Sequence, residues 1–194
     1  MTVFPDFKVF RETYDDDRPQ VVWTTLVADL ETPVSAMLKL AEGRPNSFLL
    51  ESVEGGAIRG RYSFIGMMPD LIWRCFGDRA EINRDARADV RTFEPCPGGT
   101  IESLRALVAE SRIDLPVGLP PMAAGLVGYM AYDMVRLVER LPGNEPDDIE
   151  TPDGMFLRPT VMAVFDSIED TMTVITPVRP NPEYGAKAAF EMAS

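Results

Sequence analysis

Polar side chains directly follow an apolar run in the first third of the chain. Residues 47–52 read Ser-Phe-Leu-Leu-Glu-Ser, so Glu51 and Ser52 stand at the exit of this run, and Arg59 and Arg61 lie at the start of the next one. In a regular strand neighbouring side chains point to opposite faces, so either Glu51 or Ser52 should face the core. A buried carboxylate or hydroxyl requires a hydrogen-bonding partner. Two arrangements fit this pattern: an ion pair between Glu51 and one arginine, or a pocket for a zwitterion with an apolar body.

In the pocket interpretation, the serine hydroxyl and free strand backbone groups bind the polar end of the ligand, and an apolar wall takes its side chain. A second candidate wall is the stretch Ala-Ala-Gly-Leu-Val-Gly-Tyr-Met-Ala-Tyr, residues 123–132. Glycines within a strand favour close approach of another backbone or of a ligand. Tight sheet packing explains this stretch as well as a ligand does. In the ligand interpretation Tyr129 and Met130 supply aromatic and thioether contacts.

The sequence offers little for a self-contained active site. Its 194 residues include no histidine, which removes the commonest general base and metal ligand. Catalysis would have to use carboxylates, Lys39, tyrosine or cysteine. Cys75 and Cys96 lack the spacing of metal ligands, so we interpret them as reduced structural thiols. We therefore expect no catalytic residue, metal site or cofactor in this chain.

Composition is that of a globular protein of one domain, or of one large domain with an extension. Hydrophobic residues make up 45% and charged residues 26%, and the formal net charge is −12 with no basic cluster. This balance argues against nucleic acid and anionic membranes as partners. We see neither an apolar segment of about 20 residues, which a bilayer requires, nor a signal peptide. The expected location is cytoplasmic.

Apolar periodicity predicts an α+β fold, mainly antiparallel sheets with flanking helices. Strands are expected over residues 21–27, 48–52, 61–66, 71–76, 80–82, 122–132, 160–165 and 172–176, and helices over residues 34–41, 101–111, 134–141 and from 182 onward. Successive strands with short connections should pair antiparallel.

Helix starts are predicted from their capping residues. Thr32, Thr100 and Asp133 are the expected N-caps of the first three helices. The last helix should begin at Pro182 and carry an apolar stripe that includes Tyr184, Ala188 and Met192. This helix has no stop signal, which suggests either a frayed terminus or the front part of a longer protein.

Two loops have compositions that suggest ligands. Gly55, Gly56 and Gly60 lie in the bend after residue 54, but no helix follows, as a phosphate loop requires. The acidic loop 144–153 lacks the ligand spacing of a calcium loop. We interpret both as surface loops.

Three stretches together resemble the N-terminal part of component I of anthranilate synthase: LLESVEGG with GRYSFIG, GLVGYMAYDMVRLVERLP, and PDGMFLRPTVMAVFD. The resemblance runs from about Val9 to the end of the chain. It implies that residues 1–194 are the N-terminal, regulatory region of a longer subunit. The complete subunit converts chorismate to anthranilate, with ammonia from a glutamine amidotransferase subunit (component II) and with magnesium. The family's catalytic histidine and glutamates lie in its C-terminal, chorismate-binding domain, which nothing in this chain matches.

The same resemblance implies a site for L-tryptophan as feedback inhibitor. Carried over by motif, Ser52 is its principal residue, and Leu50 and Glu51 contribute backbone or edge contacts. Arg61 is expected to pair with the ligand's carboxylate or with Glu51. Since the rest of the pocket belongs to the C-terminal domain, this chain should hold an incomplete site. Unpaired strand edges also suggest self-association.

Three other interpretations remain open. Component I of aminodeoxychorismate synthase shares the fold and the starting compound. A free-standing tryptophan sensor would have no enzyme attached. A structural domain that only docks the amidotransferase would not respond to tryptophan.

Overall fold

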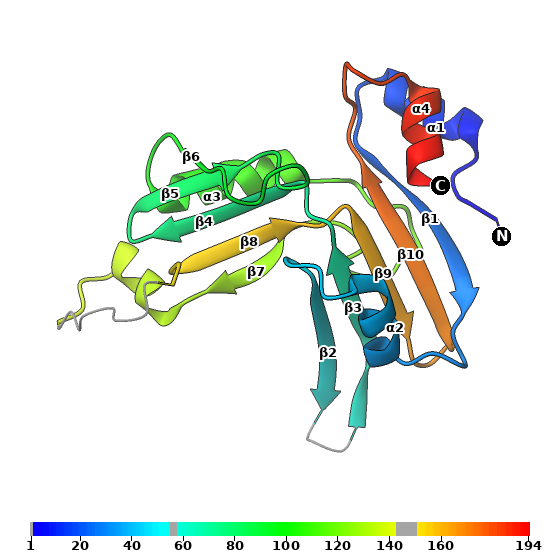
Figure 1. Cartoon of the computed structure of the whole chain (residues 1–194), viewed down its shortest axis with the longest axis horizontal. Coiled ribbons are helices and arrows are strands. Elements are labelled where there is room, and N and C mark those ends of the chain that lie inside the picture. Colours follow the sequence, from blue (N-terminus) through cyan, green and yellow to red (C-terminus); the bar gives the residue numbers. More distant parts are fainter. Residues whose placement is uncertain (1, 55–57, 143–150) are drawn as a thin grey trace. The chain divides into compact units, whose positions relative to one another are not determined.

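The computed structural model describes residues 2–54, 58–142 and 151–194, and side chains are described outside residues 52–59 (Figure 1). The chain divides into two compact units. The first consists of Met1–Met68, Ile113–Ala124 and Pro159–Ser194, and the second of Pro69–Arg112 and Gly125–Arg158. Each unit is built on one five-stranded sheet in which all neighbouring strands are antiparallel. The predicted α+β class with antiparallel sheets is confirmed.

The sheet of the first unit has the strand order β1-β10-β9-β3-β2. Its strands are β1 (Gln20–Val27), β2 (Phe48–Glu54), β3 (Ile58–Met67), β9 (Val161–Asp166) and β10 (Thr171–Val178). All five were predicted, each to within a few residues. The strand β2 lies at one edge of the sheet, and the order gives it β3 as its neighbour.

Three helices cover one face of this sheet: α1 (Phe7–Asp15), α2 (Pro33–Ala41) and α4 (Ala186–Ala193). Directly opposed residues of an antiparallel ladder share a face. Phe165 and its partner Met172 pack with Ala36 of α2. Val22 and Val178, which alternation places on the same face, pack against α1 and α4. The opposite face packs against residues 113–124.

Helix α2 begins as predicted. The Oγ1 of Thr32 accepts a hydrogen bond from Ser35 N at 3.1 Å, and the Oγ of Ser35 accepts one from Thr32 N at 3.0 Å. These reciprocal bonds satisfy two backbone donors that the helix start leaves unpaired. Pro33 occupies the first turn, where its missing N–H costs nothing.

The ends of the chain differ from the prediction. Helix α1 was not expected, although Asp6 caps it by accepting a hydrogen bond from Val9 N at 3.0 Å. Helix α4 begins at Ala186 rather than at Pro182. Its packed side is not the predicted stripe, because Phe190 contacts the rings of Phe7 and Phe10 of α1 while Tyr184 and Met192 are exposed. The partner of α4 is α1, which sequence spacing within α4 did not indicate.

The sheet of the second unit has the order β6-β5-β4-β8-β7. Its elements are β4 (Leu71–Phe76), β5 (Arg79–Asn83), β6 (Glu94–Pro95), α3 (Thr100–Ser111), β7 (Val127–Met130), the 3₁₀ helix η1 (Tyr132–Leu137) and β8 (Gly154–Arg158). Trp73 is fully buried between this sheet and α3, and its Nε1–H donates to Ser103 Oγ at 3.2 Å. Strands β6 and β8 were not predicted.

Two predicted elements of this unit are shorter than expected. The strand expected over 122–132 is confined to β7, and the helix expected over 134–141 is the 3₁₀ helix η1, capped at Ala131 rather than Asp133. Gly128 explains the close pairing of β7 with β8, because a Cβ there would lie 1.8 Å from the carbonyl oxygen of Met155. The glycine therefore permits backbone contact, as the sheet-packing interpretation holds.

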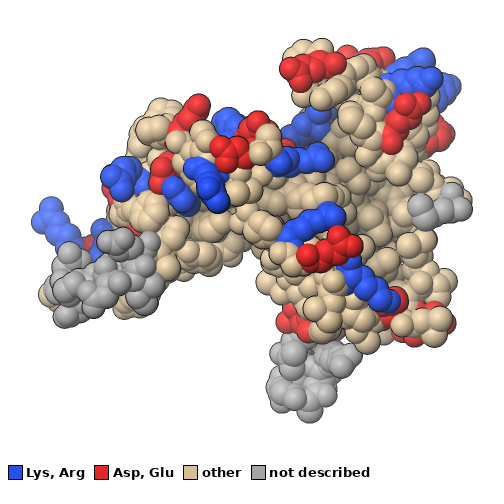
Figure 2. Space-filling view, viewed as in Figure 1, with Lys and Arg blue, Asp and Glu red and all other residues tan. Residues whose placement is uncertain are grey.

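Charged side chains of both signs are scattered over one face of the molecule (Figure 2). On the face shown in Figure 2, Lys and Arg side chains of the described residues are interspersed with Asp and Glu. In the described part of the chain no helix combines the length and the apolar character needed to cross a membrane.

Helix α3 is capped by a residue from the β4–β5 turn rather than by Thr100. Gly99 is the N-cap and has no side chain, and Thr100 N donates to Asp78 Oδ1 at 2.9 Å. We expect Asp78→Ala to lower the free energy of unfolding by about 1 kcal/mol, because a backbone donor loses its acceptor. Asp78→Asn keeps the side-chain oxygen and should stay near wild type in urea unfolding. Equal losses in both variants would contradict this role.

A nearly buried guanidinium joins β8 to α3 and to the residue that precedes β4. Arg158 binds Asp70 through Nε at 2.8 Å and Nη2 at 2.9 Å, and Glu110 of α3 through Nη1 at 3.2 Å, with 10% of its side chain exposed. We expect Arg158→Ala to destabilise the fold by about 2 kcal/mol, because the partly exposed carboxylates of Asp70 and Glu110 lose a nearly buried partner that donates three charged hydrogen bonds. Arg84 also pairs with Glu110 but is 56% exposed. The control Arg84→Ala should cost no more than about 1 kcal/mol, and equal costs would contradict the assignment.

Candidate functional site

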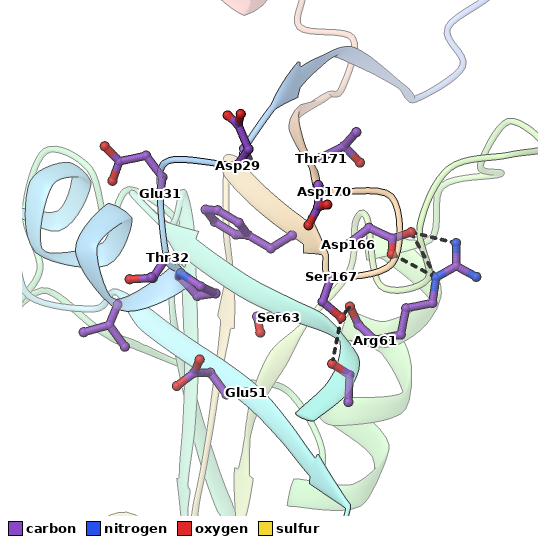
Figure 3. A pocket seen from close by; sticks show the side chains of 15 residues that line it. Asp29, Glu31, Thr32, Glu51, Arg61, Ser63, Asp166, Ser167, Asp170 and Thr171 are labelled. Atoms are coloured by element: carbon purple, nitrogen blue, oxygen red, sulfur yellow. Dashed lines mark hydrogen bonds and ion pairs between the residues drawn. The ribbon is translucent and has the colours of Figure 1, made fainter. Parts of the chain in front are cut away.

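A cleft of ≈ 380 Å³ opens in the first unit at the end of the sheet where β1, β2 and β9 finish and β3 and β10 begin. Four segments line it: the β1–α2 connection, the first turn of α2, the β2–β3 hairpin and the β9–β10 turn (Figure 3). Its charged lining residues are Asp29, Glu31, Glu51, Arg61, Asp166 and Asp170.

The sheet register places Glu51 on the floor of this cleft. Glu51 stands opposite Ser63, and Ser63 stands opposite Phe165, so the three residues form one row on the face that α2 covers. Leu50 is opposite Phe64, on the other face, with 40% of its surface exposed. Of the predicted site residues in this unit, Glu51 and Arg61 therefore share the cleft, while the side chain of Leu50 points away from it.

Arg61 forms its ion pair with Asp166, from the end of β9. Its Nε lies 3.0 Å from both carboxylate oxygens and its Nη2 lies 2.7 Å from Oδ2, as Figure 3 shows. The side chain of Asp166 is only 11% exposed, against 45% for Arg61. Asp166 Oδ1 also accepts the backbone N–H groups of Ile168 at 3.0 Å and Glu169 at 3.4 Å. Arg61 is thus not the partner of Glu51 that the sequence suggested.

This pair favours the charged form of both of its ionisable groups. The hydrogen bond from Arg61, supported by the two backbone donors, holds the pKa of Asp166 below its ordinary value. The same hydrogen bond raises the pKa of Arg61. Both groups are therefore charged throughout the neutral range.

Ser167 makes a second connection between the β9–β10 turn and β3. Its N–H donates to the carbonyl oxygen of Arg61 at 2.9 Å, and its Oγ–H donates to that carbonyl at 3.1 Å and to Gly60 O at 3.4 Å. Asp166 and Ser167 were not predicted as site residues. Their types indicated a turn, but the partner of Asp166 lies 105 residues away in the sequence.

The electrostatic character of the cleft is negative. Five carboxylates and one guanidinium line it, and the guanidinium is already paired. Glu31 accepts a hydrogen bond from Ser35 Oγ at 2.7 Å and pairs with Lys39, and the Lys39 hydrogen bond lowers the pKa of Glu31. Lys39, named above as a possible catalytic residue, is thus engaged by a carboxylate. The cleft suits an ammonium group better than an unpaired anion.

Ser52, the principal predicted residue, lies on β2 at an irregular position. The β2–β3 register shifts between the pairs of Glu51 and Val53, so the backbone at Ser52 departs from the regular ladder. The side chains of Ser52 and Arg59 lie outside the described residues. The role of Ser52 stays a prediction.

Tyr129 and Met130 belong to the second unit, whereas Leu50, Glu51 and Arg61 belong to the first. They lie on the edge strand β7, with 46% and 50% of their surfaces exposed, and Tyr129 Oη–H donates to Pro152 O at 2.9 Å. Their role as a ligand wall also stays a prediction.

The two cysteines carry free thiols, as expected. Cys75 is buried in the core of the second unit, and burial raises its pKa to about 11. Burial also raises the pKa of Cys96. Among the described residues no group of three or more His, Cys, Asp and Glu side chains is placed to hold a metal ion. The glycines 55 and 56 and most of the acidic loop, residues 144–150, lie outside the described residues.

Comparison with known proteins defines the class to which this arrangement belongs. No family model matches the chain. A solved structure, anthranilate synthase component I from Streptococcus pneumoniae TIGR4, shares the fold with a TM-score of 0.53 and 19% identity, over 86% of this chain and 35% of that one. The two antiparallel five-stranded sheets therefore match the N-terminal part of that structure.

Sequence comparison gives the relationship directly. The chain is 52% identical over 188 residues to "Anthranilate synthase component 1" of Cereibacter sphaeroides, which covers 97% of this chain and 38% of that protein. It is 42% identical over 167 residues to the protein of the same name from Thermus thermophilus, over 84% of this chain and 33% of that protein. The chain is homologous to the N-terminal part of anthranilate synthase component 1 and spans about a third of the length of these relatives.

The Arg61–Asp166 pair makes a prediction for acid stability. Because the pKa of Asp166 is lowered in the folded state, its contribution is present above the unfolded value of about 3.9 and is lost as pH falls through the folded value. Asp166→Asn should therefore be less stable near neutrality and lose less stability than wild type below about pH 4. Urea midpoints across this pH range measure the difference.

The control is Asp170→Asn, which removes a carboxylate from the same turn but not from the Arg61 pair. The urea midpoint of Asp170→Asn should fall toward acid pH as much as that of the wild-type protein. If the urea midpoints of wild type and Asp166→Asn change with pH in parallel, the prediction is contradicted.

Proposed function

We propose that these residues form the regulatory region of an anthranilate synthase component 1 and bind L-tryptophan as a feedback inhibitor. The observation that carries this proposal is the 52% identity to the Cereibacter sphaeroides protein over nearly the whole chain. That relative is an anthranilate synthase component 1, which also favours anthranilate synthase over aminodeoxychorismate synthase and over a free-standing tryptophan sensor. We place the protein in the cytoplasm.

The chemistry itself belongs to the remainder of component 1. The complete enzyme would convert chorismate and ammonia to anthranilate and pyruvate, with component II releasing the ammonia from glutamine. The sequence has no histidine, and the described residues include no group suited to magnesium. The negative cleft would also repel the carboxylates of chorismate. This chain alone should therefore be inactive.

Tryptophan has the features that the exit of β2 would recognise. The carboxylate of Glu51, on the cleft floor, is suited to the ligand's ammonium group. Because β2 is an edge strand of the described sheet, one side of its backbone is available to hydrogen-bond the ligand, with the Ser52 hydroxyl as a further donor or acceptor.

Inhibition requires that tryptophan bind one arrangement of the enzyme better than another. If it favours an arrangement with low affinity for chorismate, then chorismate must weaken tryptophan binding by the same factor. Residues of this chain would contribute only part of the tryptophan contacts, so the isolated chain should bind more weakly than the complete subunit.

A substitution at Ser52 tests the proposal in a complete component 1 whose N-terminal region is this sequence. Ser52→Phe should raise the tryptophan concentration for half-inhibition of anthranilate formation at least about tenfold, because the larger side chain occupies ligand space. Ser47→Phe, at a serine before β2, is the control and should leave that concentration unchanged. Unaltered inhibition in Ser52→Phe would refute the site, and a wild-type subunit that ignores tryptophan would refute the function.

A further inference from the structure

The β2–β3 hairpin extends past the strand that supports it. Strand β9 pairs with β3 only over Tyr62–Met67, and the last of these pairs joins Tyr62 to Asp166. The residues of β2 that follow Glu51 pair with Ile58 and Arg59, which lie before this supported part of β3. A two-stranded ribbon is only marginally stable by itself in water. The segment that carries Ser52 therefore depends on how firmly β3 is held where it leaves β9.

Contacts from the β9–β10 turn hold β3 at that point. The turn binds Gly60 and Arg61 through the carboxylate of Asp166 and through the N–H and hydroxyl of Ser167 (Figure 3). We call these four residues the turn clamp. They extend the attachment of β3 by two residues beyond its last ladder pair with β9.

The guanidinium of Arg61 is fully oriented by the clamp. Nε and Nη2 both bond to the nearly buried carboxylate of Asp166, and the guanidinium carbon lies 4.9 Å from the centre of the Tyr62 ring. Since its charge is matched by Asp166, a ligand carboxylate would have to compete with a bidentate pair. Arg61 is thus better placed to hold the hairpin than to bind the ligand.

We propose that Asp166 is a positioning residue for the tryptophan site: through Arg61 and the hairpin it fixes the strand exit that carries Glu51 and Ser52. This inference rests on the proposed function for its ligand, while the clamp itself is a property of the fold. It assigns Arg61 a role different from the direct carboxylate contact that the family resemblance implied.

Double-mutant analysis separates the two roles of Arg61. Asp166→Asn keeps an acceptor for the N–H groups of Ile168 and Glu169 but removes the charge that holds Arg61. In the complete component 1 carrying these residues, Asp166→Asn and Arg61→Ala should each weaken tryptophan binding about tenfold, and the double variant should be little weaker than either single one. Arg61→Lys should recover part of the loss. If Asp166→Asn leaves the tryptophan Kd unchanged or lowers it, the proposal is wrong.

Tryptamine, which lacks the carboxylate, provides the second readout. If Arg61 has a positioning role, Arg61→Ala should raise the Kd values of tryptamine and tryptophan by the same factor, because the whole strand exit is displaced. A direct contact predicts a loss for tryptophan alone, which would overturn the proposal. Glu169→Gln is the matched control: it removes a charge from the same turn at an exposed side chain that does not line the cleft, and it should leave both Kd values near wild type.

Hydrogen exchange of the 194-residue chain tests the clamp without any ligand. Asp166→Asn should speed exchange at least about tenfold, relative to the amides of β10, at those amides of the β2–β3 ladder (residues 48–51 and 63–66) that are protected in the wild-type chain, since local opening becomes easier. Unchanged relative exchange would show that no clamp exists. If exchange rises but the wild-type subunit does not bind tryptophan, the proposed function fails while the clamp stands.

Discussion

The attachment of β3 to the β9–β10 turn is the constraint on which the candidate site depends. In the described sheet β3 is the one strand that pairs with β2, which also packs against α2, and β3 extends beyond β9 at the end where the cleft opens. Backbone pairing alone supports β3 as far as Tyr62. Beyond that residue the support comes from the backbone N–H of Ser167 and from side chains, above all from the bidentate pair of Arg61 with the nearly buried Asp166. A bidentate pair whose carboxylate is nearly buried is well suited to this task, since its geometry is specific and loss of the guanidinium would leave that carboxylate without its counter-charge.

Most of the strands could be predicted because the signals for a strand lie within the strand and its flanking turns. The runs 21–27, 48–52 and 71–76 combine β-branched or aromatic residues with turn residues at their ends, and each became a strand. Thr32 with Pro33 likewise gave the start of α2. Helix α1 could have been found too, because Asp6 is a good cap and the buried Phe10 and Tyr14 are four residues apart.

What could not be predicted depended on partners distant in sequence. Strand β8 is defined by its pairing with β4, about eighty residues earlier, and α3 takes its cap from Asp78 in another turn. The candidate site shows the same division. Glu51 was found from its place after an apolar run, whereas Asp166 and Ser167 resemble ordinary turn residues until β9 lies beside β3. The pairing of Glu51 with Arg61, one of the alternatives that the sequence left open, is not formed because Arg61 binds Asp166, whose position beside β3 the sequence does not indicate.

The central claim, that the exit of β2 binds tryptophan, is tested most directly by titrating L-tryptophan into the isotopically labelled 194-residue chain and following its backbone amide chemical shifts. This measurement detects weak binding, which is what an incomplete site would give. The account predicts saturable shifts at Leu50, Glu51, Ser52 and Ser63, with D-tryptophan producing smaller ones. Saturable shifts confined to the second unit, or none at concentrations that shift the complete subunit, would contradict it.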